Sequence, residues 1–356
     1  MRASGGREYA ELALAVKAWG RELGFQAVGI ADTELTGAEA HLQDWLARGW
    51  HGEMEYMARH GRRRTRPAEL VPGTLRVIAC RMNYATELRA GEEVLAALAG
   101  DSQLAYVARY ARGRDYHKLL RARLQALADR IAAEIGEFGY RVFTDSAPVM
   151  EVELAAKAGL GWRGKHTLLL SREAGSYFFL GEIYTDLPLP VDAPVEPHCG
   201  SCTSCMSVCP TQAIRGPYSL EARRCISYLT IELKGSIPLE FRTLIGNRVY
   251  GCDDCQLVCP WNSFAQRSDE PDFAVRNGLD SARLVELFAW NAAEFEARMA
   301  GSAIRRIGHE RWLRNLAVGL GNARTSSDVI AALHSRADDP SALVREHVAW
   351  ALQRHV

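Results

Sequence analysis

The sequence lacks several features that define large classes of protein. Its 43 basic residues balance 43 acidic ones, so the formal net charge is zero, which taken alone argues against a nucleic-acid partner. No run of about eighteen uncharged apolar residues occurs, and no membrane span is predicted. The first residues, MRASGGREYAELALAVKAWG, contain no apolar core of the length that a signal peptide requires. We therefore expect a cytoplasmic protein without a membrane partner.

Motifs of several common enzyme classes are also missing. The segment AGLGWRGKHT is rich in glycine, yet it matches neither the G-x-G-x-x-G pattern nor a P-loop. This argues against a dinucleotide-binding fold and against nucleotide hydrolysis. We recognise no Ser-His-Asp set and no H-E-x-x-H metal motif. The chemistry of the chain must therefore lie in other residues.

Cysteine, in contrast, is concentrated and regularly spaced. Eight of the nine cysteines form the run C-x-x-C-x-x-C-x-x-x-C-P, a lone Cys and the run C-x-x-C-x-x-x-C-P. Two 4Fe-4S clusters are bound in this way, with the last Cys of each run serving the other run's cluster. Val249 stands where the second run would have a further Cys, and Cys225 is the nearby replacement. The predicted ligands are Cys199, Cys202, Cys205 and Cys259 for one cluster, and Cys209, Cys225, Cys252 and Cys255 for the other.

Two other uses of these cysteines fit less well. Zinc sites also use C-x-x-C pairs, but zinc ribbons lack the x-x-x-C-P ending. Disulfides require an oxidising compartment, which the N-terminal sequence does not indicate. Cys80 lies apart in the apolar run TLRVIAC, where a buried structural thiol is expected. The pattern therefore predicts a protein that moves single electrons.

The remaining patterns predict a multidomain α+β protein. β-branched runs at residues 74–80 and 140–145 indicate buried strands, and helical spacing over 116–138 indicates a helix. Prolines mark a domain edge near residue 188, and residues 219–235 between the cysteine runs have helical spacing. The predicted domains are an α/β domain over 1–187, a ferredoxin-like domain over 188–268 and a helical domain with a HEAT-like repeat over 269–356.

Basic residues gather in three runs despite the neutral total. The first contains Arg62, Arg63 and Arg64, the second begins at Arg109, and the third contains Arg305, Arg306, Arg311 and Arg314. A solvated helix face explains any one of these runs by itself. The three runs together raise the hypothesis of a phosphate-binding surface.

Asp145 is the best candidate for a reacting side chain. It ends a predicted strand and precedes Ser146 and Pro148, so its carboxylate should lie in a loop at a sheet edge, where ligands commonly bind. Alternatively, it caps a helix that begins near Pro148. The nearby glycines of AGLGWRGKHT allow a backbone to approach a flat or anionic cofactor. The segment YARGRDYHKLL brings aromatic, Arg, Asp and His residues together, which is also compatible with a functional site. The alternative is the capped start of a helix with an ordinary surface His.

Six strings, in this order, resemble the epoxyqueuosine reductase family, which performs the last step in making the tRNA wobble nucleoside queuosine. They are RYARGRDYHK, FTDSAPVMEVELAAKAGLGWRGKHTLL, FFLGEI, CGSCTSCMSVCPTQAI, RRCISYLTIELKG and YGCDDCQLVCPWN. Many ferredoxins share the cysteine run alone, but the ordered series is specific to the family. With the terminal repeat, the resemblance covers nearly the whole chain from about Tyr9.

The resemblance implies cobalamin in the N-terminal domain, reduced by electrons from the two clusters, and Asp145 as the proton donor that opens the epoxide. The missing glycine after Asp115-Tyr116-His117 agrees with a family whose lower cobalt face has no protein His. The family more often has Asn at position 166. The implied cobalamin contacts are Tyr110, Asp145, Ser146, Gly164, Lys165, His166, Thr167, Ser227 and Asp253.

The implied partners are a tRNA with a GUN anticodon that carries epoxyqueuosine and an unidentified electron donor. We expect a monomer, with the basic runs and the helical tail gripping the anticodon stem-loop. A corrinoid reductive dehalogenase is a rival, but such proteins usually carry an export signal and lack a basic helical tail. A simple electron carrier is a second rival, although about 190 organised residues before the cysteines are too many for one.

Overall fold

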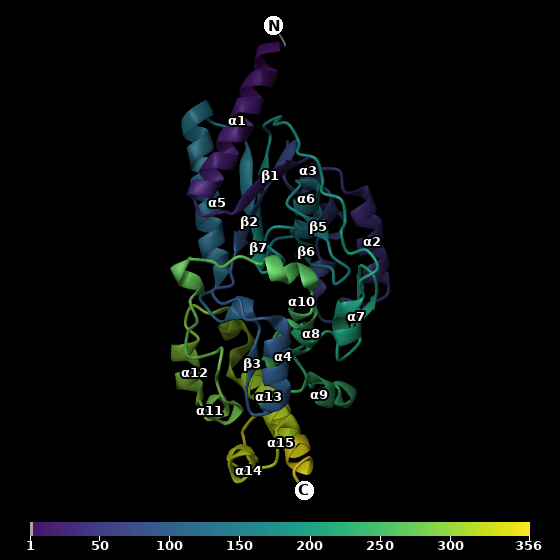
Figure 1. Ribbon diagram of the computed structural model, residues 1–356, viewed down its shortest axis with the longest axis vertical. Coiled ribbons are helices and arrows are strands. Elements are labelled where there is room, and N and C mark those ends of the chain that lie inside the picture. The colour runs from purple at the N-terminus through teal and green to yellow at the C-terminus, as the bar shows by residue number, and fades with distance from the viewer. Residues whose placement is uncertain (1–2) are drawn as a thin grey trace. The chain divides into compact units, whose positions relative to one another are not determined.

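The structure is a computed structural model and describes residues 3–356 of the chain. Its contacts group the chain into two units, each built from three segments that are distant in the sequence (Figure 1). Unit 1 contains Met1–Ala85, Tyr116–Cys202 and Trp261–Ser268, and unit 2 contains Thr86–Asp115, Thr203–Pro260 and Asp269–Val356. The boundaries of the three predicted domains stay a prediction.

Unit 1 is built on a four-stranded sheet. The strand order is β1 (Ala27–Ala31), β2 (Arg76–Asn83), β7 (Phe178–Thr185) and β4 (Tyr140–Phe143). All neighbouring strands are antiparallel, so this part is α+β, and the predicted α/β class is wrong in that respect. The predicted strands are confirmed, although β4 lies at the edge and is only partly buried. Cys80 on β2 is fully buried, as expected.

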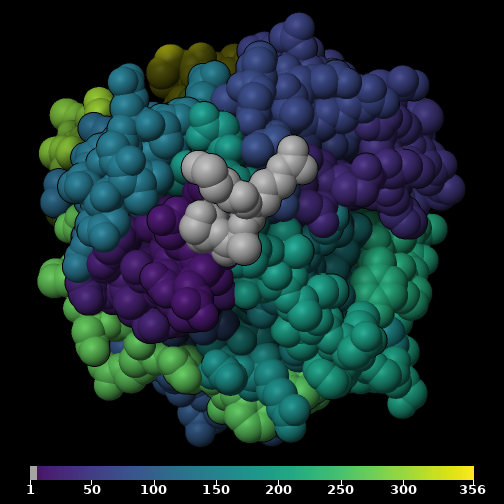
Figure 2. Space-filling view, turned by 90° about the horizontal axis from the view of Figure 1, so that it is seen from above, coloured from purple at the N-terminus to yellow at the C-terminus, as the bar shows by residue number. Residues whose placement is uncertain are grey.

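Two long helices cover one face of this sheet. α1 (Ala3–Glu22) lies against α5 (Tyr116–Ile135), as Figures 1 and 2 show, and an ion pair joins Glu22 to Arg130. The ring of Tyr116 stacks on Phe179 of β7, with 3.8 Å between the ring centroids. The helix predicted over residues 116–138 is therefore confirmed, and its first residue is fixed against the central sheet.

A short helix, α6 (Glu151–Lys157), packs on the other face of the sheet. A Cβ atom at Gly29 would lie 2.0 Å from the carbonyl oxygen of Ala158, so glycine allows β1 to approach the end of this helix. The other elements of unit 1 are α2 (Thr36–Ala47), η1 (Glu55–Met57), η2 (Gly61–Thr65), α3 (Pro67–Leu70) and the hairpin of β5 (Trp162–Arg163) and β6 (Leu169–Leu170).

Unit 2 has its own apolar core, formed by two short parallel strands and the C-terminal helices. The strands are β3 (Tyr106–Val107) and β10 (Arg248–Tyr250). Around them lie α4 (Gly91–Gly100), η3 (Arg109–Ala111), α7 (Ser204–Val208), α9 (Leu239–Ile245), α10 (Asp254–Leu257) and the hairpin of β8 (Ile214–Gly216) and β9 (Ser219–Leu220). Several of these short elements carry or flank a cysteine of the predicted cluster motif.

The single helix predicted over residues 219–235 is wrong. The segment contains β9, a 3-10 turn over Ala222–Arg224 and only a short helix, α8 (Ile226–Ile231). Cys225 has an extended backbone, with φ −70° and ψ 129°, and it precedes the first turn of α8. The helix therefore begins directly after the cysteine, which leaves the Cys225 thiol in the loop.

The C-terminal part of unit 2 is helical, as predicted. It contains α11 (Leu284–Phe288), α12 (Ala292–Arg298), α13 (Gly308–Asn322), α14 (Ser327–His334) and α15 (Ala342–Gln353). α13 is buried without interruption from Trp312 to Gly321 and packs against α15. A helix buried on all sides is part of a core. The HEAT-like character of this region stays a prediction.

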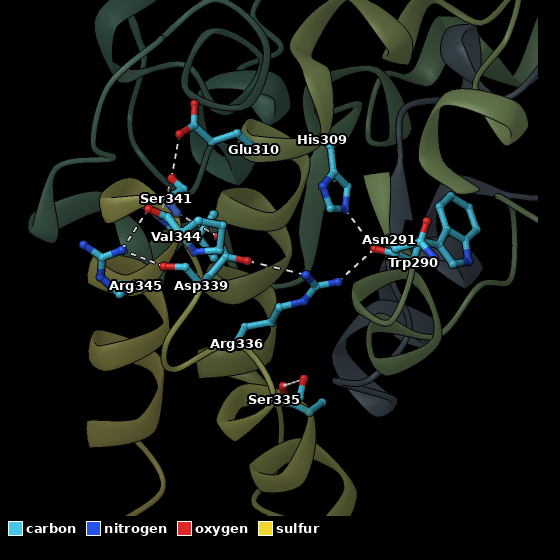
Figure 3. Close-up of polar contacts among 12 residues, drawn as sticks. Trp290, Asn291, His309, Glu310, Ser335, Arg336, Asp339, Ser341, Val344 and Arg345 are labelled. Carbon is cyan, nitrogen blue, oxygen red and sulfur yellow. Dashed lines mark hydrogen bonds and ion pairs between the residues drawn. The ribbon is translucent and has the colours of Figure 1, made fainter. Parts of the chain in front are cut away.

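Polar contacts fix the turns between these helices (Figure 3). The carbonyl oxygen of Trp290 lies 2.8 Å from His309 Nε2 and accepts a hydrogen bond from Arg336. Ser341, which caps α15, donates to Glu310 at the start of α13 with an O–O distance of 2.6 Å. Within residues 3–356, no helix is both long and apolar enough to cross a membrane.

Candidate functional site

Four thiols of the predicted second cluster are neighbours in unit 2. Cys209 follows α7, Cys225 precedes α8, Cys252 follows β10 and Cys255 lies in α10. Burial raises the pKa of the Cys255 thiol, and the nearby Cys225 and Cys209 raise it further. Burial also raises the pKa of Cys252 and of Cys225, with Cys225 and Cys209 respectively adding to the effect. Each of these four thiols thus has another of the four nearby, and one 4Fe-4S cluster requires four thiolates.

Backbone amides supply hydrogen bonds to these sulfurs. Ala213 N–H donates to Cys209 Sγ over 3.2 Å, and the amides of Ser227 and Tyr228 donate to Cys225. Such hydrogen bonds favour the thiolate and tune the reduction potential of a bound cluster. The residues present therefore fit an iron-sulfur cluster both in number and in their polar surroundings.

The side chain of Lys165 contacts the loop that carries Cys199 and Cys202, and all three residues belong to unit 1. Its Nζ atom donates to the carbonyl oxygens of Gly200, at 2.6 Å, and Cys202, at 2.8 Å. The loop also contains a turn in which Cys202 N–H donates to the Cys199 carbonyl oxygen. The sequence predicted Lys165 at the edge of a cofactor, and the structure places its charge on the backbone that carries two cluster ligands.

The helix α13 holds the segments around Cys225 and Cys252 with buried side chains. Arg314 donates to the carbonyl oxygens of Leu229, Leu233 and Gly235, and Asn315 donates to those of Thr230 and Val249. The Arg314 side chain is fully buried. The prediction that Arg314 binds tRNA is therefore wrong, because its guanidinium is enclosed and bonded to backbone.

The other predicted tRNA residues differ in exposure. Arg62, Arg63, Arg305 and Arg306 are exposed, although Arg62 and Arg305 pair with Glu39 and Glu296. Arg64 is buried at 5% exposure and donates to the Tyr56 and Val149 carbonyl oxygens, so its assignment as a tRNA contact is wrong. Arg311 is half-buried and donates to three backbone carbonyls. A charge run in sequence does not distinguish such arginines from solvated ones.

Asp145 lies in the loop between β4 and α6, with its carboxylate held by two side chains of α5. Tyr116 donates its hydroxyl to Oδ2, and His117 Nε2 lies 2.6 Å from Oδ1. Because α6 begins at Glu151 and Met150 precedes it without a side-chain cap, Asp145 is not a helix cap. His117 is likewise no ordinary surface residue. The sequence placed these residues in separate motifs and did not predict their pairing.

Buried polar side chains lie near Asp145 that the sequence analysis missed. Glu182 on β7 is fully buried, and neither of its carboxyl oxygens has a hydrogen-bond partner among the described residues. Glu151 and Tyr184 also have a buried, unpartnered oxygen. Burial raises the pKa of Glu182 well above its usual range, and the charge of Asp145 raises it further. An acidic residue within the apolar string FFLGEI was the available signal.

The predicted Gly-Lys loop connects β5 to β6. Thr167 has φ 76°, and a Cβ atom at Gly164 would lie 2.8 Å from the His166 ring. His166 is buried, its Nδ1 accepts from Leu168 N–H, and burial lowers its pKa to about 4. Its Nε2 has no partner within the described residues. Ser146, also predicted as a contact, lies 3.4 Å from Thr144 between hydroxyl oxygens.

Unit 1 contains further buried polar atoms that have no partner among residues 3–356. They include both side-chain polar atoms of Asn83, Nε of Arg81 and Nε1 of Trp162. Buried polar atoms are nearly always hydrogen-bonded in folded proteins, so a group of exceptions indicates a bound polar ligand or a catalytic role. These unpartnered atoms fit a polar ligand on unit 1.

The three cofactor contacts predicted in unit 2 have other neighbours there. Asp253 is buried, and its Oδ2 accepts from the Tyr106 hydroxyl and the Arg109 amide, each at 2.8 Å. Tyr110 is half-buried beside the ring of Tyr250. Ser227 is half-buried and donates its amide to Cys225. The clearest role of Asp253 in the structure is to hold β3 and η3 against the second cysteine run.

Comparison with known families defines the class of protein. Residues 198–262 match the family described as 4Fe-4S double cluster binding domain. Together with the clustered thiols and the hydrogen-bonded carboxylate, this match defines an iron-sulfur oxidoreductase. Residues 64–146 match the family described as epoxyqueuosine reductase QueG, DUF1730.

Relatives identify the family. Epoxyqueuosine reductase of Burkholderia pseudomallei (strain K96243) is 62% identical, over 97% of this chain and 93% of the relative. A crystal structure of epoxyqueuosine reductase with a tRNA-Tyr epoxyqueuosine-modified stem loop has a TM-score of 0.87, at 27% identity, over 98% of this chain and 91% of that one. A Bacillus subtilis epoxyqueuosine reductase, solved with its catalytic aspartate loop swung out of the active site, has the same score, identity and coverage. The chain belongs to the epoxyqueuosine reductase family.

Proposed function

We propose that this chain reduces epoxyqueuosine to queuosine in tRNA and that Asp145 donates the proton that opens the epoxide. The observation that carries the residue assignment is the fixed carboxylate of Asp145, held by Tyr116 and His117. Family membership supports the reaction, and the solved relative with a modified tRNA stem loop supports a tRNA substrate.

The reaction requires an acid because opening an epoxide places negative charge on oxygen. Asp145 lies in a loop, so it can face a substrate, while two contacts from α5 orient its oxygens. A donor that is already oriented contributes to catalysis through both geometry and proton transfer. When bound, cobalamin and the two 4Fe-4S clusters supply the electrons for the reduction.

For cobalamin, we propose contacts from Ser146 and from the Gly-Lys loop, Gly164 to Thr167, in unit 1. The buried, unpartnered Nε2 of His166 and side chain of Asn83 support a polar ligand on this unit. Tyr110, Asp145, Ser227 and Asp253 stay predicted contacts. Lys165 has a further role in this proposal, because its ammonium group positions the Cys199–Cys202 loop through two carbonyl bonds.

For the clusters, we keep the predicted ligand sets. Mutual proximity within unit 2 supports Cys209, Cys225, Cys252 and Cys255 as one set. The closed count of eight cysteines leaves Cys199, Cys202, Cys205 and Cys259 for the other.

For tRNA, we propose that Arg62, Arg63, Arg305 and Arg306 contact backbone phosphates. These four are the exposed members of the predicted set. A GUN anticodon, an unidentified electron donor, a monomeric state and a cytoplasmic location stay predictions. Exposed guanidinium groups would supply sequence-independent, salt-sensitive affinity.

The decisive experiment is anaerobic reduction of anticodon stem-loop RNA that carries epoxyqueuosine, using the reconstituted protein with and without cobalamin. Mass analysis of the nucleoside should show loss of one oxygen only when cobalamin is present. Unchanged epoxyqueuosine, despite intact clusters and bound cobalamin, would contradict the proposed reaction and favour a small-molecule substrate.

A further inference from the structure

The proposed reaction consumes more protons than Asp145 can carry. Both C–O bonds of the epoxide break, a C=C bond forms, and the oxygen leaves as water. This change takes up two electrons and two protons, and the bound clusters and cobalamin account for the electrons. Asp145 carries one proton, so a second must reach the site during each turnover. The inference below rests on the proposed function and concerns the source of that proton.

Glu182 lies next to the Asp145 loop in the fold. It is paired with Phe143 across the β4–β7 register, and Asp145 follows Phe143 by two residues. Glu182 is 0% exposed, and both carboxyl oxygens lack a partner within the described part of the chain. An ionised carboxylate is strongly disfavoured in this position, and a neutral carboxyl group is disfavoured far less. Burial therefore favours a protonated Glu182.

Glu151, the first residue of α6, belongs to the same group. Its Oε1 is buried without a partner. Burial raises the pKa of Glu151 well above the usual range, the charges of Glu182 and Asp145 raise it further, and Arg64 lowers it. Carboxyl groups that repel one another in this way do not all ionise together. The neutral form is therefore favoured in the pair of Glu151 and Glu182.

Three other titratable groups lie around Glu182 and Glu151, and a further one, His117, contacts Asp145 itself. Tyr184 lies on the same face of β7, and burial raises its pKa above the range in which a phenol ionises in water. Cys80 lies on β2, and burial likewise raises its pKa. Arg64 faces Glu151 and Tyr184, and its guanidinium is bonded to backbone carbonyls.

We propose that Glu182 stores the second proton of the reaction and returns it to Asp145 with the help of Glu151. Asp145 first protonates the epoxide oxygen as one C–O bond breaks. A solvent molecule then relays a proton from the Glu151–Glu182 pair to the Asp145 carboxylate, since Glu182 has no hydrogen bond to Asp145 in the described structure. Asp145 delivers this proton as the second C–O bond breaks and water leaves. Solvent restores the missing proton after product release. Glu151 and Glu182 act through Asp145 and are positioning residues.

The stored proton is measurable without turnover. Infrared spectra of the holoenzyme at about pH 8 should contain the C=O stretch of protonated carboxyl groups, at a pH where ordinary carboxyls are ionised. Glu182→Gln should remove intensity from this band, whereas Glu137→Gln, an exposed residue of the same unit, should not. A wild-type spectrum with no such band, or a band unaffected by Glu182→Gln, would overturn the proposal.

Single-turnover kinetics test the function of the proton. Glu182→Gln should slow queuosine formation by about 10- to 100-fold at about pH 8. The loss should shrink near pH 6, because solvent then resupplies Asp145 more readily, and Glu182→Asp should recover part of the rate. A purely structural role predicts an equal loss at both pH values, and that result would overturn the proposal.

Glu151→Gln covers the case in which Glu182→Gln does not fold. Part of the Glu151 residue is exposed at the start of a helix although its Oε1 is buried, and its variant should show the same pH-dependent loss. If Glu151→Gln has the pH profile of the wild type, Glu151 has no role in the reaction. The proposed return of a proton to Asp145 would then be overturned. Failure of the wild-type enzyme to form queuosine is a different result, because it contradicts the proposed function itself.

Discussion

The two units differ in how many of their buried polar groups are hydrogen-bonded. In unit 2, Arg314, Asn315, His347 and Asp253 are buried, and each is hydrogen-bonded to backbone or to another side chain. In unit 1, atoms of residues such as Asn83, His166, Glu182 and Tyr184 are buried without a partner in the described structure. Trp312 is the exception on the unit 2 side.

This difference distinguishes buried groups with a structural role from buried groups with a functional role. A satisfied buried network contributes to stability and fixes the backbone, here around Cys225 and Cys252. A buried polar atom without a partner costs free energy. Such an atom is expected where it binds a ligand or carries a proton during function. We therefore expect substitutions in unit 2 to affect folding first, and substitutions near Asp145 in unit 1 to affect function first.

Asp145→Asn should have the largest effect. The amide keeps the shape of the side chain but cannot donate the reacting proton, so turnover should fall by about 100- to 10,000-fold. Cluster absorbance, cobalamin binding and the melting temperature should remain close to those of the wild type. Asp129→Asn, on the exposed side of α5, is the matched control. Near-normal queuosine formation by Asp145→Asn would remove this residue as the acid.

A pair of buried substitutions tests the contrast directly. Arg314→Met leaves three carbonyl oxygens without their donor, and the free energy of unfolding should fall by about 3 kcal/mol or more. Asn83→Leu removes two atoms that have no partner in the described part of the chain, so in cobalamin-free protein it should change stability by less than about 1 kcal/mol. Denaturant titrations measure both, and equal losses would break the contrast between the units. Weaker cobalamin binding by Asn83→Leu would sharpen it.

The stability of the protein should depend on pH through two buried histidines, His166 and His347. Burial lowers the pKa of His166 and of His347 to about 4 from the usual 6.5. Between these values the unfolded chain binds more protons than the folded chain. Stability should therefore be lost as the pH falls from about 6.5 to about 4, by up to about 3 kcal/mol for each histidine.

Asparagine substitutions distinguish the two histidines. His166→Asn should reduce the loss in acid with little cost at neutral pH, because His166 Nε2 has no partner among the residues that the structure describes. His347→Asn should also cost stability at neutral pH, because its ring bonds the Leu343 carbonyl and accepts from Ile237 N–H. Unfolding curves at a series of pH values provide the measurement. Identical behaviour of the two variants would contradict the assignment.

The smallest effect should come from the exposed arginines of unit 2. Arg305→Glu with Arg306→Glu should weaken binding of anticodon stem-loop RNA and reduce the salt slope by about two. Folding and cluster content should not change, because both side chains are exposed. Arg354→Glu, near the chain end, is the control for reversing one exposed charge and should leave the salt slope unchanged. An unchanged salt slope would show that these two arginines do not contact the RNA phosphates and are ordinary solvated charges.

Local patterns predicted much of the secondary structure. The apolar run around Cys80 is the central strand β2, and the helical spacing after Tyr116 is α5. These features are legible because strand and helix periodicity are local properties of the chain. The prediction of one helix across Cys225 was wrong. Periodicity does not indicate that Cys225, a predicted ligand, has an extended backbone.

Partners and burial could not be predicted in the same way. Arg64 and Arg62 are nearly adjacent in the sequence, yet one is buried and the other exposed, because their neighbours come from distant segments. The contact between His117 and Asp145 and the position of Lys165 on the cysteine loop have the same origin. In both cases the partner is separated by tens of residues in the chain and is brought close by the sheet and its loops.

The sequence by itself determined the class of chemistry, since cysteine spacing and ordered motifs encode a two-cluster family without any knowledge of the fold. The tertiary structure alone revealed which charges remain in water and which carboxyl groups surround Asp145. The physical reason is that ligand spacing is a property of one short loop, whereas solvation and the pKa of a buried group depend on every segment packed around it.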